Sequence, residues 1–278
     1  MLKKLFAHEW KDTWKLMTIV NAAMILYALI GMIIFNQKNV DTFFEGSGRG
    51  NSLAPTIGFF SYFLVYAIGI VVLSVLSLLY FFVRFYRNLY TDQGYLMHTL
   101  PVESSDLLIS KAAVAMIWRG ICILVCCIAV IMLLYSMGGP EAWGELVNAF
   151  REIHMSSGQA ILVIILILLG IVGSLAFDVS KGYAAISIGQ QMGKNKVLWC
   201  VGCYIGLNVL VSLITNIVTE TVTFSLVRMG ETNTLANLET AENTVLLIFL
   251  IIDLAMLAAS AGLYALSNHF MKNKLNLD

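Results

Sequence analysis

One acidic residue, Asp253, lies inside a long apolar stretch near the end of this 278-residue sequence. A carboxyl group within lipid is costly and usually faces a polar partner or a water-filled path. It is therefore either a substrate or proton site or a hydrogen-bonded packing residue. Asp253 lies about eight residues from the outer end of its stretch, hence about 12 Å deep and level with Asn208 in the preceding stretch. We expect these two side chains to be packing partners.

Other chemistry-bearing patterns are missing from the sequence. No G-x-S-x-G or H-E-x-x-H motif occurs, and no histidine pair has zinc-ligand spacing. The nearest approach to a phosphate-binding loop, residues 189–195, has one residue too few between its glycines and Asn195 where Ser or Thr must hold magnesium. Cys200-x-x-Cys203 lies in an apolar stretch, where cysteines pack as small hydrophobic residues. We expect no catalytic residue, metal site or cofactor in this chain.

The composition predicts a membrane protein. Apolar residues make up 59% and charged residues 12% of the chain, whereas soluble domains carry about 25% charged residues. The apolar runs are continuous rather than alternating, which favours membrane-spanning helices over barrel strands. The formal net charge of zero gives no reason to expect nucleic acid as a partner.

We therefore predict an all-α membrane protein in which residues 1–278 form a single transmembrane domain with six spans. The predicted spans are Leu16–Phe35, Ile57–Val83, Arg119–Tyr135, Gln159–Phe177, Val197–Val218 and Thr244–Leu266.

Basic residues give the expected orientation, because lysines and arginines collect on the cytoplasmic side. Thirteen of the 17 fall in the N-terminal segment, in residues 84–111 with Arg119 at the edge, in residues 178–196, and in the C-terminal tail. Both termini are therefore expected in the cytoplasm, and residues 219–243 form an external segment. Arg119 is expected at the membrane interface with its guanidinium group reaching outward.

The N-terminal segment has its own helical pattern. Leu2, Phe6, Trp10 and Trp14 recur at helical spacing, and polar residues take the opposite face. This pattern predicts that residues 1–16 form an amphipathic helix lying in the membrane interface, the alternative being a frayed cytoplasmic helix.

Residues 85–102, FYRNLYTDQGYLMHTLPV, are unusually polar and aromatic for a segment between two spans. Thr91 to Gly94 have turn chemistry, Tyr95 to Leu100 are amphipathic, and Pro101 ends any helix they form. Exposed apolar side chains of this kind mark protein contacts. We therefore expect a short element that projects into the cytoplasm and binds a partner, the alternative being an interfacial loop with its tyrosines at headgroup level.

At these residues the chain resembles the six-span permease subunits of ATP-binding-cassette exporters from Gram-positive bacteria. The resemblance rests on residues 85–96 (FYRNLYTDQGYL) followed by Thr99-Leu100-Pro101, and on residues 185–190 (AISIGQ) followed by the basic residues 194–196. Together with the inside–inside topology it covers nearly the whole chain. Gln93 stands where the family would have an acidic residue.

The resemblance implies that residues 84–111 contain a coupling helix, seated in a groove of a separate ATPase subunit. It implies a transporter of two permeases, identical or homologous, and two cytoplasmic ATPases that bind ATP and magnesium, in the bacterial plasma membrane. An amphipathic peptide or drug-like molecule is the expected cargo. The residues implied in ATPase coupling are Tyr90, Asp92, Gln93, Gly94, Tyr95, Leu96, His98, Leu100, Pro101, Gly189, Gln190 and Lys194.

Two alternatives belong to other classes of protein. An ion-coupled secondary carrier would use Asp253 as its titrating group, although the inverted repeats and broken helices of such carriers are not visible in the sequence. An intramembrane enzyme would need a second acid or a nucleophile beside Asp253. ATP dependence of transport distinguishes the exporter from both.

Overall fold

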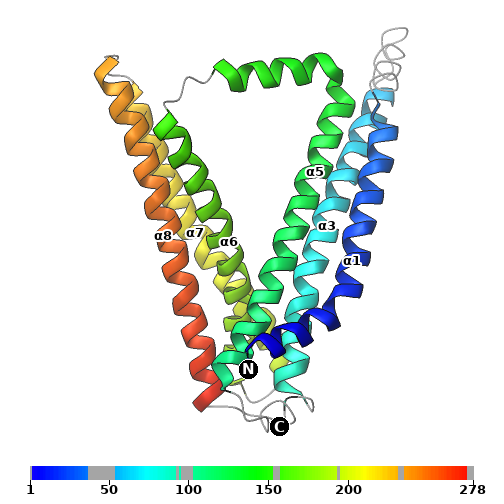
Figure 1. Cartoon of the computed structure of the whole chain (residues 1–278), viewed down its shortest axis with the longest axis vertical. Coiled ribbons are helices and arrows are strands. Elements are labelled where there is room, and N and C mark those ends of the chain that lie inside the picture. The colour runs from blue at the N-terminus through cyan, green and yellow to red at the C-terminus, as the bar shows by residue number, and fades with distance from the viewer. Residues whose placement is uncertain are drawn as a thin grey trace. The chain divides into compact units, whose positions relative to one another are not determined.

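The structure is a computed structural model, which describes residues 2–36, 54–91, 94, 103–152, 157–192, 195–230 and 235–273. These residues form long α-helices and, within those ranges, no strand. The helices are α1 (Leu2–Ile34), α3 (Ala54–Tyr90), α5 (Ser104–Glu152), α6 (Ser157–Gly189), α7 (Lys196–Gly230) and α8 (Leu235–Asn273), which are labelled in Figure 1. Each contains a stretch that is long and apolar enough to cross a membrane. The prediction of an all-α membrane protein is confirmed.

The helices extend well beyond the predicted spans. The apolar stretch in α5 runs over Ser104–Ser136 rather than beginning at Arg119. The predicted segment 219–243 is largely helical, because α7 continues to Gly230 and α8 begins at Leu235. Polar residues interrupt an apolar run without interrupting the helix. Spans predicted from hydropathy alone are therefore shorter than the helices that contain them.

A break divides α5 near its C-terminal end. Gly139 has φ 66° and ψ −173°, a conformation that an L side chain rarely adopts. Pro140 follows, and its fixed φ and missing N–H suit the first turn of a new helix. Residues 140–152 therefore leave the break as a second helical segment that runs at a wide angle to the rest of α5 (Figure 1).

Helix α1 joins the predicted interfacial stretch 1–16 and the first predicted span into one helix. Its first turns run at an angle to the remainder (Figure 1). The hydroxyl of Thr13 donates to the carbonyl of Glu9 at 2.9 Å, a back-bond that often accompanies helix bending. One stripe of α1 is buried, formed by Glu9, Thr13, Met17, Asn21, Met24, Ala28 and Gly31.

The chain divides into two compact units. The N-terminal unit comprises Lys3–Phe81 and Ile117–His154, and the C-terminal unit comprises Met1–Leu2, Phe82–Met116 and Met155–Asp278. Helices α3 and α5 each contribute to both units.

Aromatic and sulfur-containing side chains hold the N-terminal unit together. Tyr27 of α1 stacks on Tyr66 of α3 with ring centroids 5.2 Å apart, and the Tyr66 hydroxyl reaches the carbonyl of Ala129 in α5 at 3.4 Å. Phe35 and Leu133 complete this buried cluster. Because the contacts link all three helices, they define a three-helix core.

In the C-terminal unit, α6 packs against both α7 and α8. The hydroxyl of Tyr264 in α8 donates to the carbonyl of Ser105 at the start of α5, at 3.1 Å. Helix α7 exposes most of its side chains, and three of its exposed threonines donate to carbonyls one turn earlier in the same helix: Thr215, Thr219 and Thr223.

Candidate functional site

The predicted coupling segment is described only at its two ends. Asp92, Gln93, Tyr95, Leu96, His98, Leu100, Pro101 and Lys194 lie outside the described residues. Of the other predicted coupling residues, the structure places Tyr90 at the end of α3 and Gly189 at the end of α6. The N–H of Gly94 donates to the carbonyl of Thr91 at 2.6 Å, as expected from the turn chemistry of residues 91–94.

A hydrogen bond joins the two stretches of sequence that suggested the family. The Tyr90 hydroxyl at the end of α3 donates to the Ser187 hydroxyl in α6 at 2.9 Å. Tyr90 is 7% exposed and Ser187 is fully buried. The two residues are 97 positions apart in the sequence. Their contact holds the C-terminal end of α3 against the C-terminal end of α6.

Aromatic packing surrounds that bond. The rings of Phe85 in α3 and Tyr183 in α6 are stacked, with centroids 3.8 Å apart and planes within 8°. Phe82 packs edge-on against Tyr204 of α7, with centroids 5.3 Å apart. Leu89, one helical turn after Phe85 in α3, is also fully buried. These residues, with Tyr90, Ser187 and Cys200, form what we call the basal cluster, which joins α3, α6 and α7.

Most residues of the basal cluster were not predicted from the sequence. The available signal was the helical spacing of Phe82, Phe85 and Leu89, which places them on one face of α3. Tyr183 and Ser187 are four residues apart and share one face of α6. Spacing alone does not show that these two faces meet.

Gly189 and Gln190 occupy a different position from the one expected of residues that touch a partner. Gln190 is 1% exposed, and its amide Nε2 lies 4.0 Å from Sγ of Cys200. Gly189 is also buried, and a Cβ there would collide with the backbone of Cys200. Both residues therefore serve the packing of α6 on α7, and any influence on a partner is indirect.

A buried cation lies beside the basal cluster. Lys181 is 7% exposed, and its Nζ lies 3.3 Å from the Asp178 carboxylate. The same Nζ lies over the rings of Phe177 at 5.4 Å and Tyr204 at 5.7 Å. Carboxylate and aromatic faces together compensate the charge, so this part of α6 is held in place by polar as well as apolar contacts.

Arg119 contacts the neighbouring helix α3, which the sequence analysis did not predict. Its guanidinium Nη1 donates to the carbonyl and hydroxyl oxygens of Ser74, at 2.7 and 2.9 Å, and to the hydroxyl of Ser77 at 3.2 Å. Arg119 lies near the middle of the apolar stretch Ser104–Ser136, because α5 begins 15 residues earlier than the predicted span. It binds α3 inside the N-terminal unit, whereas we expected an outward-reaching interfacial side chain.

The expected pairing of Asp253 with Asn208 is not present. The Asn208 amide donates to the carbonyl of Tyr204 in its own helix at 2.8 Å. Asp253 is 8% exposed and faces α6, where a Cβ on Gly170 would lie 3.1 Å from its Oδ1. Among the described residues no hydrogen bond or ion pair reaches the Asp253 carboxylate. The partner helix of Asp253 is therefore α6, not α7.

Asp253 borders a pocket between α6 and α8 with a volume of about 520 Å³. Its lining is apolar except for the Ser174 hydroxyl and the carboxylate. The Ser174 hydroxyl donates to the carbonyl of Ile171 at 2.9 Å, which leaves its oxygen able to accept.

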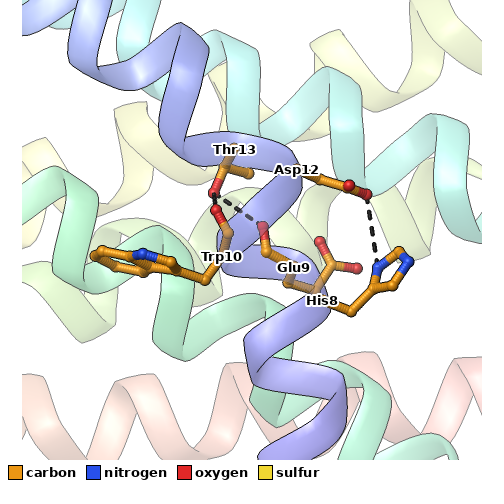
Figure 2. Close-up of polar contacts among 5 residues, drawn as sticks. All are labelled: His8, Glu9, Trp10, Asp12 and Thr13. Atoms are coloured by element: carbon orange, nitrogen blue, oxygen red, sulfur yellow. Dashed lines mark hydrogen bonds and ion pairs between the residues drawn. The ribbon is translucent and has the colours of Figure 1, made fainter.

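Polar groups also gather near the N-terminus of α1 (Figure 2). His8 Nδ1 lies 3.6 Å from an oxygen of Asp12, and both side chains are largely exposed. The Thr13 hydroxyl contacts the carbonyls of Glu9 and Trp10 (Figure 2). Trp10 stacks on Trp118 of α5 at 4.9 Å between centroids. This group anchors the start of α1 and has no arrangement typical of catalysis.

Comparison with known proteins gave no match, whether to family models, to curated proteins or to solved structures.

Proposed function

We propose that this chain is the transmembrane subunit of an ATP-driven exporter in a bacterial plasma membrane, with both termini in the cytoplasm. It works with a second permease, identical or homologous, and with two cytoplasmic ATPase subunits. The observation that carries the proposal is the segment FYRNLYTDQGYL…TLP, which follows a long apolar helix and lies among basic residues. The apolar side chains of that segment suit a protein groove better than water.

The basal cluster supports this proposal. Phe85 and Tyr90, which lie in the first half of the segment, are stacked or hydrogen-bonded to α6, and Phe82 just before it contacts α7. A displacement of the segment would therefore move the ends of α3, α6 and α7 together. Such linkage is what an exporter needs to convey a movement of its ATPase to membrane-spanning helices.

In this proposal the chain contributes no bond-breaking chemistry. ATP and magnesium bind to the partner ATPases, and the permease supplies the path and the contact that receives the movement. An amphipathic peptide or drug-like molecule is the proposed cargo.

Replacement of Leu96 by aspartate tests the proposal. An apolar side chain buried at the contact contributes about 1.5–3 kcal/mol, so a charge there should weaken ATPase binding by tenfold or more. We expect Leu96→Asp to insert normally, to lose co-purification of the ATPase and to lose ATP-dependent export. The control is Ala7→Asp, which places the same charge at an exposed position of α1, outside both predicted coupling stretches, and should leave ATPase binding and export unchanged. Unchanged ATPase binding and export in Leu96→Asp would refute the proposal.

One observation favours a second function, that of an ion-coupled secondary carrier. Asp253 is buried and, within the described chain, has no hydrogen-bonding partner. A carboxyl group in this setting is suited to binding a proton or cation during transport. Transport by purified chain alone, driven by an ion gradient and without ATP, would favour this function over the exporter.

A further inference from the structure

The pocket beside Asp253 combines two properties that rarely occur together within a membrane. Its walls are formed by apolar side chains of α6 and α8, and its charged group, among the described residues, is one carboxylate. The residues that matter here are Leu166, Gly170 and Ser174 of α6 and Leu246, Phe249 and Asp253 of α8.

Within the part of the chain that the structure describes, nothing compensates this carboxylate. Asp253 is 8% exposed, and no hydrogen bond or ion pair within the described residues reaches it. Elsewhere the same fold compensates its buried charges, as Lys181 shows with Asp178 and Arg119 with Ser74. Buried charges in proteins are normally paired or hydrogen-bonded, because desolvation is otherwise too costly. The missing partner is therefore expected to be a ligand.

A glycine of α6 makes room for the carboxylate at the edge of the pocket. Gly170 has no side chain at the point where a Cβ would lie 3.1 Å from Oδ1 of Asp253. The pocket volume of about 520 Å³ lies within the range of about 300–1,000 Å³ that is typical of sites for drug-sized molecules. The carboxylate is thus accessible from a cavity of suitable size.

We propose that this pocket binds an amphipathic organic monocation. Its charged head pairs with the Asp253 carboxylate beside Gly170, and the Phe249 ring adds attraction for a cation. Its apolar body packs against Leu166 and Leu246.

Other occupants fit the pocket less well. Calcium and magnesium need about six oxygen ligands and zinc prefers histidine or cysteine, whereas the described lining offers one carboxylate and one hydroxyl. A phospholipid would hold its charged headgroup at the membrane interface, about 12 Å from Asp253. The inference needs only the pocket and stands whether or not an ATPase couples to this chain.

The test uses two probes of the same shape and opposite charge, tetraphenylphosphonium and tetraphenylborate. Equilibrium binding is measured on the full-length chain in lipid nanodiscs, with empty nanodiscs as the background. We expect saturable binding of the phosphonium at one site and at least tenfold weaker binding of the borate. In Asp253→Asn, phosphonium affinity should fall at least tenfold and the preference for the cation should vanish.

Two further variants guard against an effect of misfolding. Asp253→Glu keeps the charge and should bind phosphonium within about threefold of the wild type, since it preserves the electrostatic attraction. Glu220→Gln removes an exposed carboxylate from α7 in the same unit and should change nothing. Equal binding of the two probes to the wild type would overturn the proposal in favour of a lipid-like occupant. Absence of saturable phosphonium binding, or unchanged binding in Asp253→Asn, would overturn it as well.

Discussion

At the scale of single residues, two charged side chains within the apolar stretches, Arg119 and Asp253, have opposite surroundings. The Nη1 of Arg119 makes three hydrogen bonds to Ser74 and Ser77 of the neighbouring helix. Asp253 has no such contact among the described residues and borders a pocket. A satisfied charge contributes to the association of helices, whereas an unsatisfied one is available to a ligand.

The hydrogen bonds from Arg119 to Ser74 predict that the contribution of Ser74 to the free energy of unfolding depends on the presence of Arg119. We expect Ser74→Ala to lower the free energy of unfolding in the wild type and to have almost no effect when Arg119 is already methionine. The coupling should be about 0.6–2 kcal/mol, the range measured for hydrogen bonds between membrane helices. A double-mutant cycle of thermal unfolding in detergent measures it. Purely additive effects would show that the observed contacts carry no interaction energy.

Among the elements, α5 is unusual because it ends one helical segment and begins another at a single glycine. At φ 66° and ψ −173°, Gly139 adopts a backbone conformation that is almost exclusive to glycine. The Tyr135 and Trp143 rings pack edge to face across the break, with centroids 6.3 Å apart. The direction of the second segment is therefore set by one residue and supported by an aromatic contact.

Two glycine-to-alanine variants test this interpretation. Gly139→Ala should reduce the free energy of unfolding by about 1–3 kcal/mol, because alanine is strained in that conformation. Gly144→Ala is the matched control within the second segment, since a Cβ there meets no atom within 4 Å. The control should stabilise the helix by up to about 1 kcal/mol. Equal effects of the two variants on thermal unfolding would mean that the break does not depend on glycine.

The sequence allowed the type of each element to be predicted much better than its contacts. Continuous apolar runs gave the six helices because a span needs only length and hydrophobicity. The third span was predicted to begin at Arg119, whereas the apolar stretch of α5 begins at Ser104, because Asp106 and Lys111 lower the hydropathy of its first turns without interrupting the helix. The pairing of Asp253 with Asn208 was wrong, and the contacts of Arg119 with α3 were not predicted, because depth arithmetic gives a level in the membrane but not the face of the helix or its neighbour.

For the whole molecule, the bias of basic residues predicts the orientation. Arg119 lies within the apolar stretch of α5, so it no longer counts among the cytoplasmic basic residues. Twelve basic residues then remain on the cytoplasmic side, against four on the other side. The expected direction is therefore unchanged, because the rule depends on charges in the segments that flank the spans.

Cysteine labelling in intact cells tests the orientation. In a cysteine-free background, single cysteines at the exposed positions Glu103 and Asn195 should be protected from an impermeant thiol reagent. A cysteine at Glu145, which is also exposed, should react. Permeabilised cells provide the control, since all three positions should then react. Labelling of Asn195 from outside would reverse the topology and remove the basis for a cytoplasmic partner.

Exposed threonines of α7 satisfy their hydroxyl protons within the helix itself. Thr215, Thr219 and Thr223 each donate to a carbonyl of the same helix, at 2.8 to 2.9 Å. Their protons are therefore occupied when lipid tails surround the helix, while the hydroxyl oxygens still accept bonds when water does. A change of medium along α7 breaks none of these bonds. The hydroxyl groups of these threonines therefore keep a hydrogen bond whether hydrocarbon or water surrounds this part of α7.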